Sequence, residues 1–311
     1  MQRIFHTPEG VRDIYSQECS RKQKLQEKLH RVFHQYGFED IETPTFEYFE
    51  VFSKEVGTIP SRDLYKFFDR EGNTLVLRPD FTPSVSRACA TYFNPEKEVV
   101  SLCYTGNTFI NNSSFRGRLK ETTQMGVERM GDDSPEADAE ILAMTVECLL
   151  TAGLTEFQVS VGQVDYYKAI FAQTGMSQEE EEELRELISQ KNYFGVEELV
   201  KSKKMDKSLA KVLSQLPQMF GSAEVLEKAK ALTDNPQALK AVARLEEIYE
   251  LLKVYGYEKY ITFDFAMLSK YHYYTGIIFQ AYTYGTGEPL IKGGRYNQLM
   301  KHFGKPAASI G

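Results

Sequence analysis

The chain has 311 residues, of which 42% are hydrophobic and 26% are charged, a composition typical of soluble globular proteins. A chain of this length buries about 75% of the surface that its unfolded form exposes, so it needs no disulfide or metal to build a core. The formal net charge of −7 offers no overall basic field for a nucleic-acid backbone. These values argue against a disulfide scaffold, a disordered chain and a globally basic nucleic-acid-binding protein.

Neither the cysteines nor the histidines show the spacing of a metal site or a catalytic triad. We therefore expect reduced thiols in a cytoplasmic protein with no metal and no cofactor. No stretch approaches the ~20 apolar residues that span a bilayer, so neither export nor membrane insertion is expected. The residues concerned are Cys19, Cys89, Cys103, Cys148, His6, His30, His34, His272 and His302.

The first part of the chain alternates between helical and extended patterns. Apolar residues at helical spacing predict an amphipathic helix over 17–36 that ends at Gly37. The next segment contains Pro44, which cannot donate a ladder hydrogen bond and so favours an edge strand. Runs at 65–69 and 75–77 flank a polar turn at 70–73 and predict a β-hairpin, with a helix following over about 83–92.

Two strands are predicted over 101–110 and 120–131, separated by a polar loop at 111–117. In the second strand Gln124, Gly126 and Glu128 share one face, because side chains alternate with a period of two. We expect the glycine to leave space for a ligand between the two polar side chains. A helix over about 135–152 and a strand over 157–164 follow.

Residues 165–256 change character and are interpreted as an all-helical insertion. Ser177 followed by Glu180 predicts a capping box, and further helical patterns continue to residue 256. The acidic run 179–183 is interpreted as a solvated helix face rather than a metal site. Strands resume in 261–268, 275–284 and 290–296.

Seven short motifs, in this order and at this spacing, resemble class II aminoacyl-tRNA synthetases, and specifically the histidyl-tRNA synthetase subgroup. The resemblance implies an α+β fold in which a class II synthetase-like antiparallel sheet is flanked by helices. It places the core at 1–164 and 257–311 and the helical insertion at 165–256. The motifs are Gly10-Val11-Arg12-Asp13, Gly37-Phe38 through Thr43-Pro44, Leu77-Arg78-Pro79-Asp80-Phe81-Thr82, Gly117-Arg118 through Gln124-Met125-Gly126-Val127-Glu128, Ala137-Asp138-Ala139-Glu140, Tyr273-Tyr274-Thr275-Gly276 and Gly293-Gly294-Arg295-Tyr296.

Three departures from the synthetase pattern argue against amino-acid activation. The Phe-Arg-x-Glu pattern of motif 2 falls on Phe109-Ile110-Asn111-Asn112, and losing one such charge-stabilising donor costs ~3 to 4 kcal/mol of transition-state stabilisation. The Arg-Gly-Leu-Asp stretch falls on Ser269-Lys270-Tyr271-His272, and lysine lacks the arginine fork. The sequence stops at Ala308-Ser309-Ile310-Gly311, where motif 3 would present its arginine, and we expect no anticodon-binding domain in this chain and no catalytic residues.

The resemblance also implies a retained pocket for histidine. Asp80, Thr82 and Gln124 would hold the ammonium and carboxylate of histidine, while Glu128 and Tyr274, with Tyr273 beside it, would meet the imidazole. Carboxylates and amides are the acceptors that ammonium and imidazole N–H groups require. The alternatives are strand residues satisfied within the fold and, for the tyrosines, core aromatics.

Three basic residues cluster near the motif 2 loop, namely Arg116, Arg118 and Lys120. They either contact a phosphate or another anion, or form an ordinary solvated basic loop. The paired glycines at 293–294 predict a sharp turn rather than a phosphate-binding loop, because no helix-initiating phosphate motif surrounds them.

A synthetase-like fold that retains this pocket but lacks the ATP-activating residues resembles the regulatory subunits of ATP phosphoribosyltransferase. The resemblance implies a non-catalytic protein that activates a short-form catalytic subunit in the first step of histidine biosynthesis and mediates feedback inhibition by histidine. It also implies a cytoplasmic hetero-octamer built partly on a synthetase-like dimer, with the segment 37–44 at the dimer interface and no nucleic-acid partner. The alternatives are an active histidyl-tRNA synthetase with a divergent motif 2 and a stand-alone amino-acid-binding module.

Overall fold

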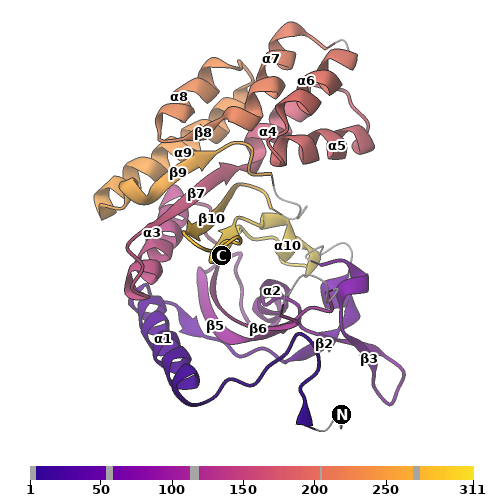
Figure 1. The fold of residues 1–311 in the computed structure, drawn as a ribbon, viewed down its shortest axis with the longest axis vertical. Coiled ribbons are helices and arrows are strands. Elements are labelled where there is room, and N and C mark those ends of the chain that lie inside the picture. Colours follow the sequence, from indigo (N-terminus) through magenta and orange to yellow (C-terminus); the bar gives the residue numbers. More distant parts are fainter. Residues whose placement is uncertain (1–4, 54–58, 113–118, 204, 269–273) are drawn as a thin grey trace. The chain divides into compact units, whose positions relative to one another are not determined.

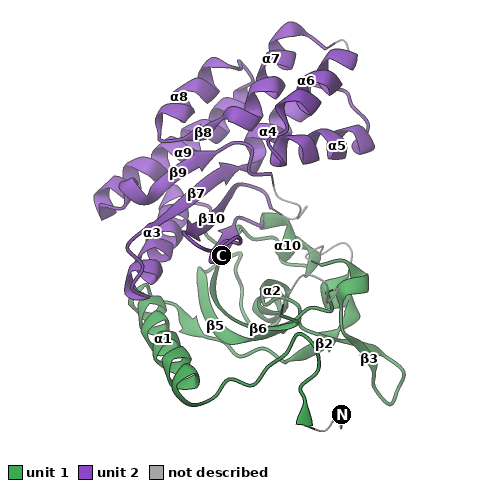
Figure 2. Cartoon of the chain, viewed as in Figure 1, with its two compact units in different colours: residues 1–132, 297–311 green, residues 133–296 purple. Residues whose placement is uncertain are grey.

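The structure is a computed structural model that describes residues 5–53, 59–112, 119–203, 205–268 and 274–311. The chain forms two compact units (Figure 2). Unit 1 contains residues 1–132 and 297–311, and unit 2 contains residues 133–296. The first unit is therefore assembled from both ends of the chain.

The main sheet of unit 1 is built around a long antiparallel pair, β5 and β6 (Figure 1). In the order β1-β5-β6-β12, β1 pairs in parallel with β5 at one edge, as its proline-flanked sequence predicted. The helix α1 ends just before Gly37, whose φ of 78° is the left-handed conformation that glycine adopts easily, which confirms the predicted helix end. The bounds are α1 Ser16–Gln35, β1 Glu39–Asp40, β5 Val100–Phe109, β6 Glu121–Met130 and β12 Ser309–Ile310.

A second, smaller sheet of unit 1 has the order β2-β4-β3. Strands β3 and β4 form the predicted hairpin, and their turn contains Gly72 with a φ of 87°. The helix α2 follows, close to its predicted position. The bounds are β2 Phe46–Tyr48, β3 Lys66–Phe68, β4 Thr74–Leu77, α2 Thr82–Tyr92, α10 Asn297–His302 and the short 3-10 helices Phe49–Phe52 and Ser61–Asp63.

The core of unit 1 lies between α2 and one face of the β5–β6 pair. Val85 and Cys89 of α2 pack against Leu102 and Met130 of the sheet, and each of these side chains is buried. The period of two in β6 that the sequence showed therefore places Glu128 on the same face as Met130, toward this core.

Unit 2 contains a five-stranded sheet in the order β11-β10-β7-β9-β8. Strand β7 pairs antiparallel with β10 and parallel with β9. The capping box between Ser177 and Glu180 is present at the start of α5, as predicted. The bounds are α3 Pro135–Thr151, β7 Phe157–Gln163, α4 Val164–Phe171, α5 Gln178–Ser189, α6 Tyr193–Ser202, α7 Lys207–Gln215, β8 Phe220–Gly221, α8 Glu224–Ala231, α9 Pro236–Tyr255, β9 Ile261–Asp264, β10 Ile277–Thr283, β11 Ile291–Gly294 and the 3-10 helices Leu216–Gln218 and Glu258–Tyr260.

Among the described residues of 165–256, β8 is a strand, so the expectation of an entirely helical segment is wrong at this point. Phe220 and Gly221 pair antiparallel with Asp264 and Phe263 of β9 and extend the sheet by one short strand. Two residues are too few to show a period of two, which is why the sequence pattern did not indicate this strand. The division into a core and an insertion stays a prediction.

Several other expectations can be compared with the structure. All four cysteines are free thiols, and three of them are buried. Glu179, Glu182 and Glu183 are exposed on α5, as predicted for a solvated helix face. Among the helices in the described parts of the chain, none combines the length and the apolar character needed to cross a membrane.

Candidate amino-acid-binding site

A buried carboxylate lies at the centre of the predicted pocket in unit 1. Glu128, on β6, is only 1% exposed. The hydroxyl of Thr82, at the start of α2, donates a hydrogen bond of 2.7 Å to Glu128 Oε1, and the Tyr104 hydroxyl approaches the same oxygen at 3.4 Å. Hydrogen bonds to a carboxylate are among the stronger ones in proteins, so these contacts fix the orientation of the Glu128 side chain.

Tyr104 is a site residue that the sequence reasoning missed. It lies directly opposite Gly126 in the β5–β6 ladder, and a Cβ placed on Gly126 would clash with the Tyr104 hydroxyl oxygen. The glycine therefore accommodates Tyr104, whereas the sequence had predicted space for a ligand. The strand register puts an aromatic residue across from a glycine, and the sequence carries no local signal for that register.

The carboxyl group of Asp80 and the phenol of Tyr104 both have shifted pKa values. Asp80 accepts a 3.4 Å hydrogen bond from the backbone N–H of Thr82. Burial raises the pKa of Asp80, although backbone hydrogen bonds from Thr82 and Phe81 oppose this change. Burial, followed by the negative charges of Glu128 and Asp80, raises the pKa of Tyr104 well above its ordinary value, so its hydroxyl remains a neutral donor.

Arg78 of the Arg-Pro-Asp motif has a structural role beside this site. It is buried, and its guanidinium donates to the carbonyls of Thr43 at 2.8 Å and Asn107 at 2.9 Å. The guanidinium also lies 4.1 Å from the centre of the Phe81 ring, which in turn stacks on Tyr104 with a centroid separation of 4.3 Å. Arg78 thus connects the segment after β1 to β5 and supports the ring that approaches Glu128.

Gln124 lies on the same face of β6 as Glu128 and is half-buried. Its partner in the ladder is Gly106, where a Cβ would lie 2.5 Å from an Arg78 nitrogen and 2.8 Å from the Phe81 ring. Any side chain at position 106 would overlap Arg78 and Phe81, which explains the glycine there. The structure therefore joins Asp80, Thr82 and Glu128 through hydrogen bonds, whereas Gln124 shares only the face of β6 with Glu128.

Of the remaining predicted site residues, three lie outside the described residues and one belongs to unit 2. Tyr273, Arg116 and Arg118 lie outside the described residues. Tyr274 belongs to unit 2, where its ring would lie 2.8 Å from a Cβ on Gly294 and its carbonyl accepts a 3.1 Å hydrogen bond from Lys168.

Lys120 packs on an N-terminal motif in unit 1. Its backbone N–H donates to the Gly10 carbonyl at 2.7 Å, and a Cβ on Gly10 would lie 2.6 Å from Lys120 Cγ. Gly10 has a φ of 84° and lies in the Gly10-Val11-Arg12-Asp13 motif. The aliphatic part of Lys120 therefore covers this turn, while the anion-contact hypothesis for Lys120 stays a prediction.

Two of the motifs noted in the sequence meet in a buried ion cluster of unit 2. Asp138 is fully buried, and its carboxylate accepts 2.6 Å from Arg295 Nε and 2.8 Å from Arg244 Nε. Burial raises the pKa of Asp138, and the two arginines oppose this change. The arginine of the Gly-Gly-Arg-Tyr motif thus neutralises the aspartate of the Ala-Asp-Ala-Glu motif rather than facing a phosphate.

Comparison with known proteins places this fold and these motifs in a family. A sequence model described as histidyl-tRNA synthetase matches residues 10–311. The ATP phosphoribosyltransferase regulatory subunit of Acetivibrio thermocellus is 39% identical over 99% of this chain and 73% of that protein. The chain belongs to the family of ATP phosphoribosyltransferase regulatory subunits, which are histidyl-tRNA synthetase-like proteins.

Other relatives agree with this assignment. The regulatory subunit of Clostridium acetobutylicum is 37% identical over 98% of this chain and 76% of that protein. A crystal structure from Bacillus halodurans, described as an ATP phosphoribosyltransferase regulatory subunit/histidyl-tRNA synthetase, has a TM-score of 0.90 and 33% identity, with 99% of this chain and 80% of that chain covered. The histidyl-tRNA synthetase of Nostoc has a TM-score of 0.83 at 21% identity over 98% of this chain and 72% of that chain, and so supports the fold alone.

Proposed function

We propose that this chain is the non-catalytic regulatory subunit of ATP phosphoribosyltransferase. In this role it activates a short-form catalytic subunit, which transfers a phosphoribosyl group to ATP in the first step of histidine biosynthesis. It also carries feedback inhibition by histidine. The complex is accordingly a glycosyltransferase, and its catalytic residues belong to the partner.

One contrast within unit 1 carries this proposal. The buried Glu128 carboxylate lies beside the hydroxyls of Thr82 and Tyr104, and a carboxylate is the kind of acceptor that an imidazole N–H requires. At the end of β5, in contrast, the positions of the synthetase arginine and glutamate hold Ile110 and Asn112. A site that keeps a carboxylate for histidine, but has isoleucine and asparagine in place of the synthetase arginine and glutamate, supports binding of the amino acid without its activation.

The backbone around Ile110 explains why a neighbouring residue is a poor substitute for that arginine. The Ile110 N–H donates to the Lys120 carbonyl at 2.9 Å, and the Asn111 N–H donates to the Asp63 carbonyl at 2.8 Å. These two hydrogen bonds fix the backbone of residues 110 and 111. A shift of the strand end that brought a neighbouring residue into the place of Ile110 would break them.

In this proposal, regulation is a coupling free energy between the binding of histidine and the association with the catalytic subunit. Histidine in the unit 1 site would favour an arrangement of the complex in which the partner is less active, and the coupling is typically about 1 to 3 kcal/mol. We further propose that the chain forms a synthetase-like dimer through the segment 37–44 within a cytoplasmic hetero-octamer, with no nucleic acid in the assembly.

Reconstitution tests the proposal directly. The purified chain is added to a short-form catalytic subunit that is inactive alone, and formation of phosphoribosyl-ATP is measured with and without histidine. We expect activity only in the mixture, and a lower rate when histidine is present. A mixture that remains inactive, although both proteins are folded, refutes the activating role.

A second assay separates the proposal from an active synthetase with a divergent motif 2. Histidine-dependent exchange of pyrophosphate into ATP requires a turnover-competent adenylate site. We expect no exchange above the level without enzyme. Exchange at a catalytic rate would reject the regulatory interpretation, whereas failure to associate with any short-form subunit would favour a stand-alone amino-acid-binding module.

A further inference from the structure

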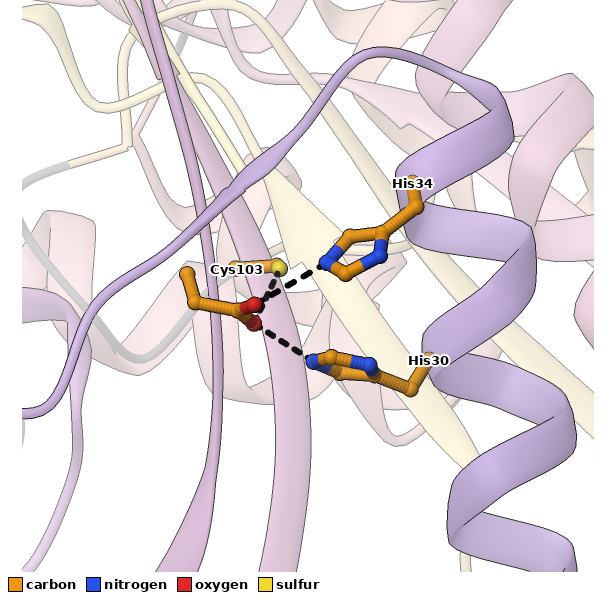
Figure 3. Close-up of side chains that lie close together, drawn as sticks. His30, His34 and Cys103 are labelled. Carbon is orange, nitrogen blue, oxygen red and sulfur yellow. Dashed lines mark hydrogen bonds and ion pairs between the residues drawn. The ribbon is translucent and has the colours of Figure 1, made fainter.

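Four side chains of unit 1 with metal-ligating atoms lie close together (Figure 3). His30 and His34 project from α1, Asp40 lies on β1, and Cys103 lies on β5. One ligand atom from each of these residues falls within 4.8 Å of all the others. We refer to these four residues as the α1–β1 cluster.

Local structure explains why these four residues meet. His30 and His34 are four residues apart on α1, so their side chains lie on the same face of the helix. The turn at Gly37 then leads the chain directly into β1, where Asp40 is the register partner of Cys103 in the parallel β1–β5 pair. The helical spacing thus places the two histidines on one face, and the strand register places Asp40 next to Cys103.

The α1–β1 cluster is separate from the candidate amino-acid-binding site. Cys103 and Tyr104 are neighbours on β5, so their side chains point to opposite faces of the sheet. Tyr104 points toward Glu128, while Cys103 points toward Asp40, to which its thiol donates a hydrogen bond of 3.4 Å. The two groups of side chains can therefore be tested independently.

Both histidines form direct hydrogen bonds to Asp40, so the side chains would have to move slightly apart to hold an ion. His30 Nε2 lies 2.5 Å from Asp40 Oδ1, and His34 Nε2 lies 3.1 Å from Asp40 Oδ2. Tetrahedral zinc with bonds of about 2.0 to 2.3 Å requires ligand atoms about 3.3 to 3.8 Å apart. Because all four ligand atoms already lie within 4.8 Å of one another, small side-chain rotations suffice to surround an ion.

The cluster combines solvent-exposed ligands with one buried ligand. In the single chain the side chains of His30, His34 and Asp40 are 36%, 45% and 59% exposed, so an ion can reach them from solvent. Asp40 also belongs to the segment 37–44 proposed for the dimer, whereas the two histidines on α1 lie outside that segment. Cys103 is fully buried and supplies the sulfur ligand from inside the sheet. The centroids of the two imidazole rings are 4.3 Å apart with a tilt of 58°, so their nitrogens approach the carboxylate from different directions.

We propose that the α1–β1 cluster binds one divalent transition-metal ion, specifically zinc, through two imidazoles, one carboxylate and one thiolate. Mixed nitrogen, oxygen and sulfur ligands with tetrahedral geometry are typical of zinc in proteins. On binding, the Cys103 S–H bond breaks, the sulfur forms its bond to the metal, and the proton passes to solvent. The ion would join the end of α1 to the sheet and stabilise unit 1.

Cobalt(II) is the probe for this site, because a thiolate bound to cobalt gives a charge-transfer absorption that imidazole and carboxylate ligands do not give. The chelator-treated full chain is titrated with Co²⁺, and Zn²⁺ is then used to displace it. We expect one Co²⁺ per chain, a charge-transfer band, and loss of the band when Zn²⁺ is added. Excess Zn²⁺ at about 100 times its dissociation constant should raise the melting temperature by roughly 5 °C.

Matched variants identify the ligands. Cys103→Ser should remove the charge-transfer band, whereas Cys19→Ser, on the same helix as the histidines but about three turns before His30, should retain it. His34→Gln should weaken binding by at least about 10-fold, whereas His6→Gln, which changes an exposed histidine, should not. Because His34 is on the helix surface, its variant tests the site even where Cys103→Ser fails to fold.

Two results would overturn the proposal. The first is the absence of stoichiometric Co²⁺ or Zn²⁺ binding by the folded chain. The second is binding that is unchanged in both Cys103→Ser and His34→Gln, which would place the metal elsewhere. These measurements use the chain alone, so their outcome does not depend on the proposed regulatory function.

Discussion

The buried Asp138 cluster allows a quantitative test of what holds unit 2 together. Arg295→Met removes a guanidinium that is only 4% exposed and leaves Asp138 with Arg244 as its remaining arginine partner. Breaking a buried ion pair by removing one partner typically costs about 3 to 5 kcal/mol, because the other charge stays buried. Methionine retains much of the side-chain volume, so the loss measures electrostatics more than packing.

The matched control is Arg244→Met. Arg244 also contacts Asp138, but its side chain is 23% exposed, so water can partly replace it. We expect a cost of roughly 1 to 2 kcal/mol. For a unit of 164 residues, 1 kcal/mol corresponds to about 2 to 4 °C in melting temperature, so Arg295→Met should lower it by roughly 10 °C and Arg244→Met by far less.

The pH dependence separates the charge effect from a packing defect. Burial already raises the pKa of Asp138, and removing Arg295 removes the main charge that opposes this rise. An acid with a raised pKa in the folded state is ionised at a cost above that pKa and is protonated without that cost below it. The destabilisation by Arg295→Met should therefore be largest above the raised pKa of Asp138 and shrink as the pH falls through that pKa toward the unfolded value.

Thermal unfolding followed by circular dichroism measures both quantities, since the chain contains no tryptophan for fluorescence. A loss of stability that stays the same across an acidic pH series would show that the cluster acts through packing alone. Equal losses for Arg295→Met and Arg244→Met would show that burial does not distinguish the two arginines. Either result refutes the reasoning.

Three further predictions concern single side chains. Glu128→Gln should weaken histidine binding about 10-fold or more in calorimetry, because a charged hydrogen bond is lost. The control Glu71→Gln, in the exposed hairpin turn, should leave the affinity unchanged. Equal affinities for the two variants would reject the pocket. Gly126→Ala should lower the free energy of unfolding by about 1 to 3 kcal/mol, because the added Cβ overlaps the Tyr104 hydroxyl. Adding Tyr104→Leu to this variant should recover part of the lost stability. A Gly126→Ala variant with unchanged melting would contradict the described register. Ser177→Ala should cost about 1 kcal/mol of local stability in α5, visible as faster amide exchange there, and unchanged exchange would mean that the capping box contributes nothing.

The sequence by itself determined most of the elements and the family. Helical periodicity with a glycine end signal located α1, a polar turn between apolar runs located the β3–β4 hairpin, and the Ser177 capping box located α5. Each of these signals is local, because the residues that define it are neighbours along the chain. The motifs likewise identified the family, since their order and spacing are properties of the sequence alone.

Only the tertiary structure decided which distant side chains meet. Tyr104 covers Gly126 because of the register between β5 and β6, and no local pattern specifies that register. Arg295 finds Asp138 across 157 residues, and a single charge within a sequence gives no indication of its partner.

The α1–β1 cluster combines both situations. His30 and His34 are four residues apart and so lie on one helix face, but this spacing alone did not predict a metal site. Their partner Cys103 lies 63 residues beyond Asp40, and only the parallel pairing of β1 with β5 brings these two together. A metal site requires ligands within a few ångströms, and that proximity is set by strand pairing, which the linear sequence does not encode locally.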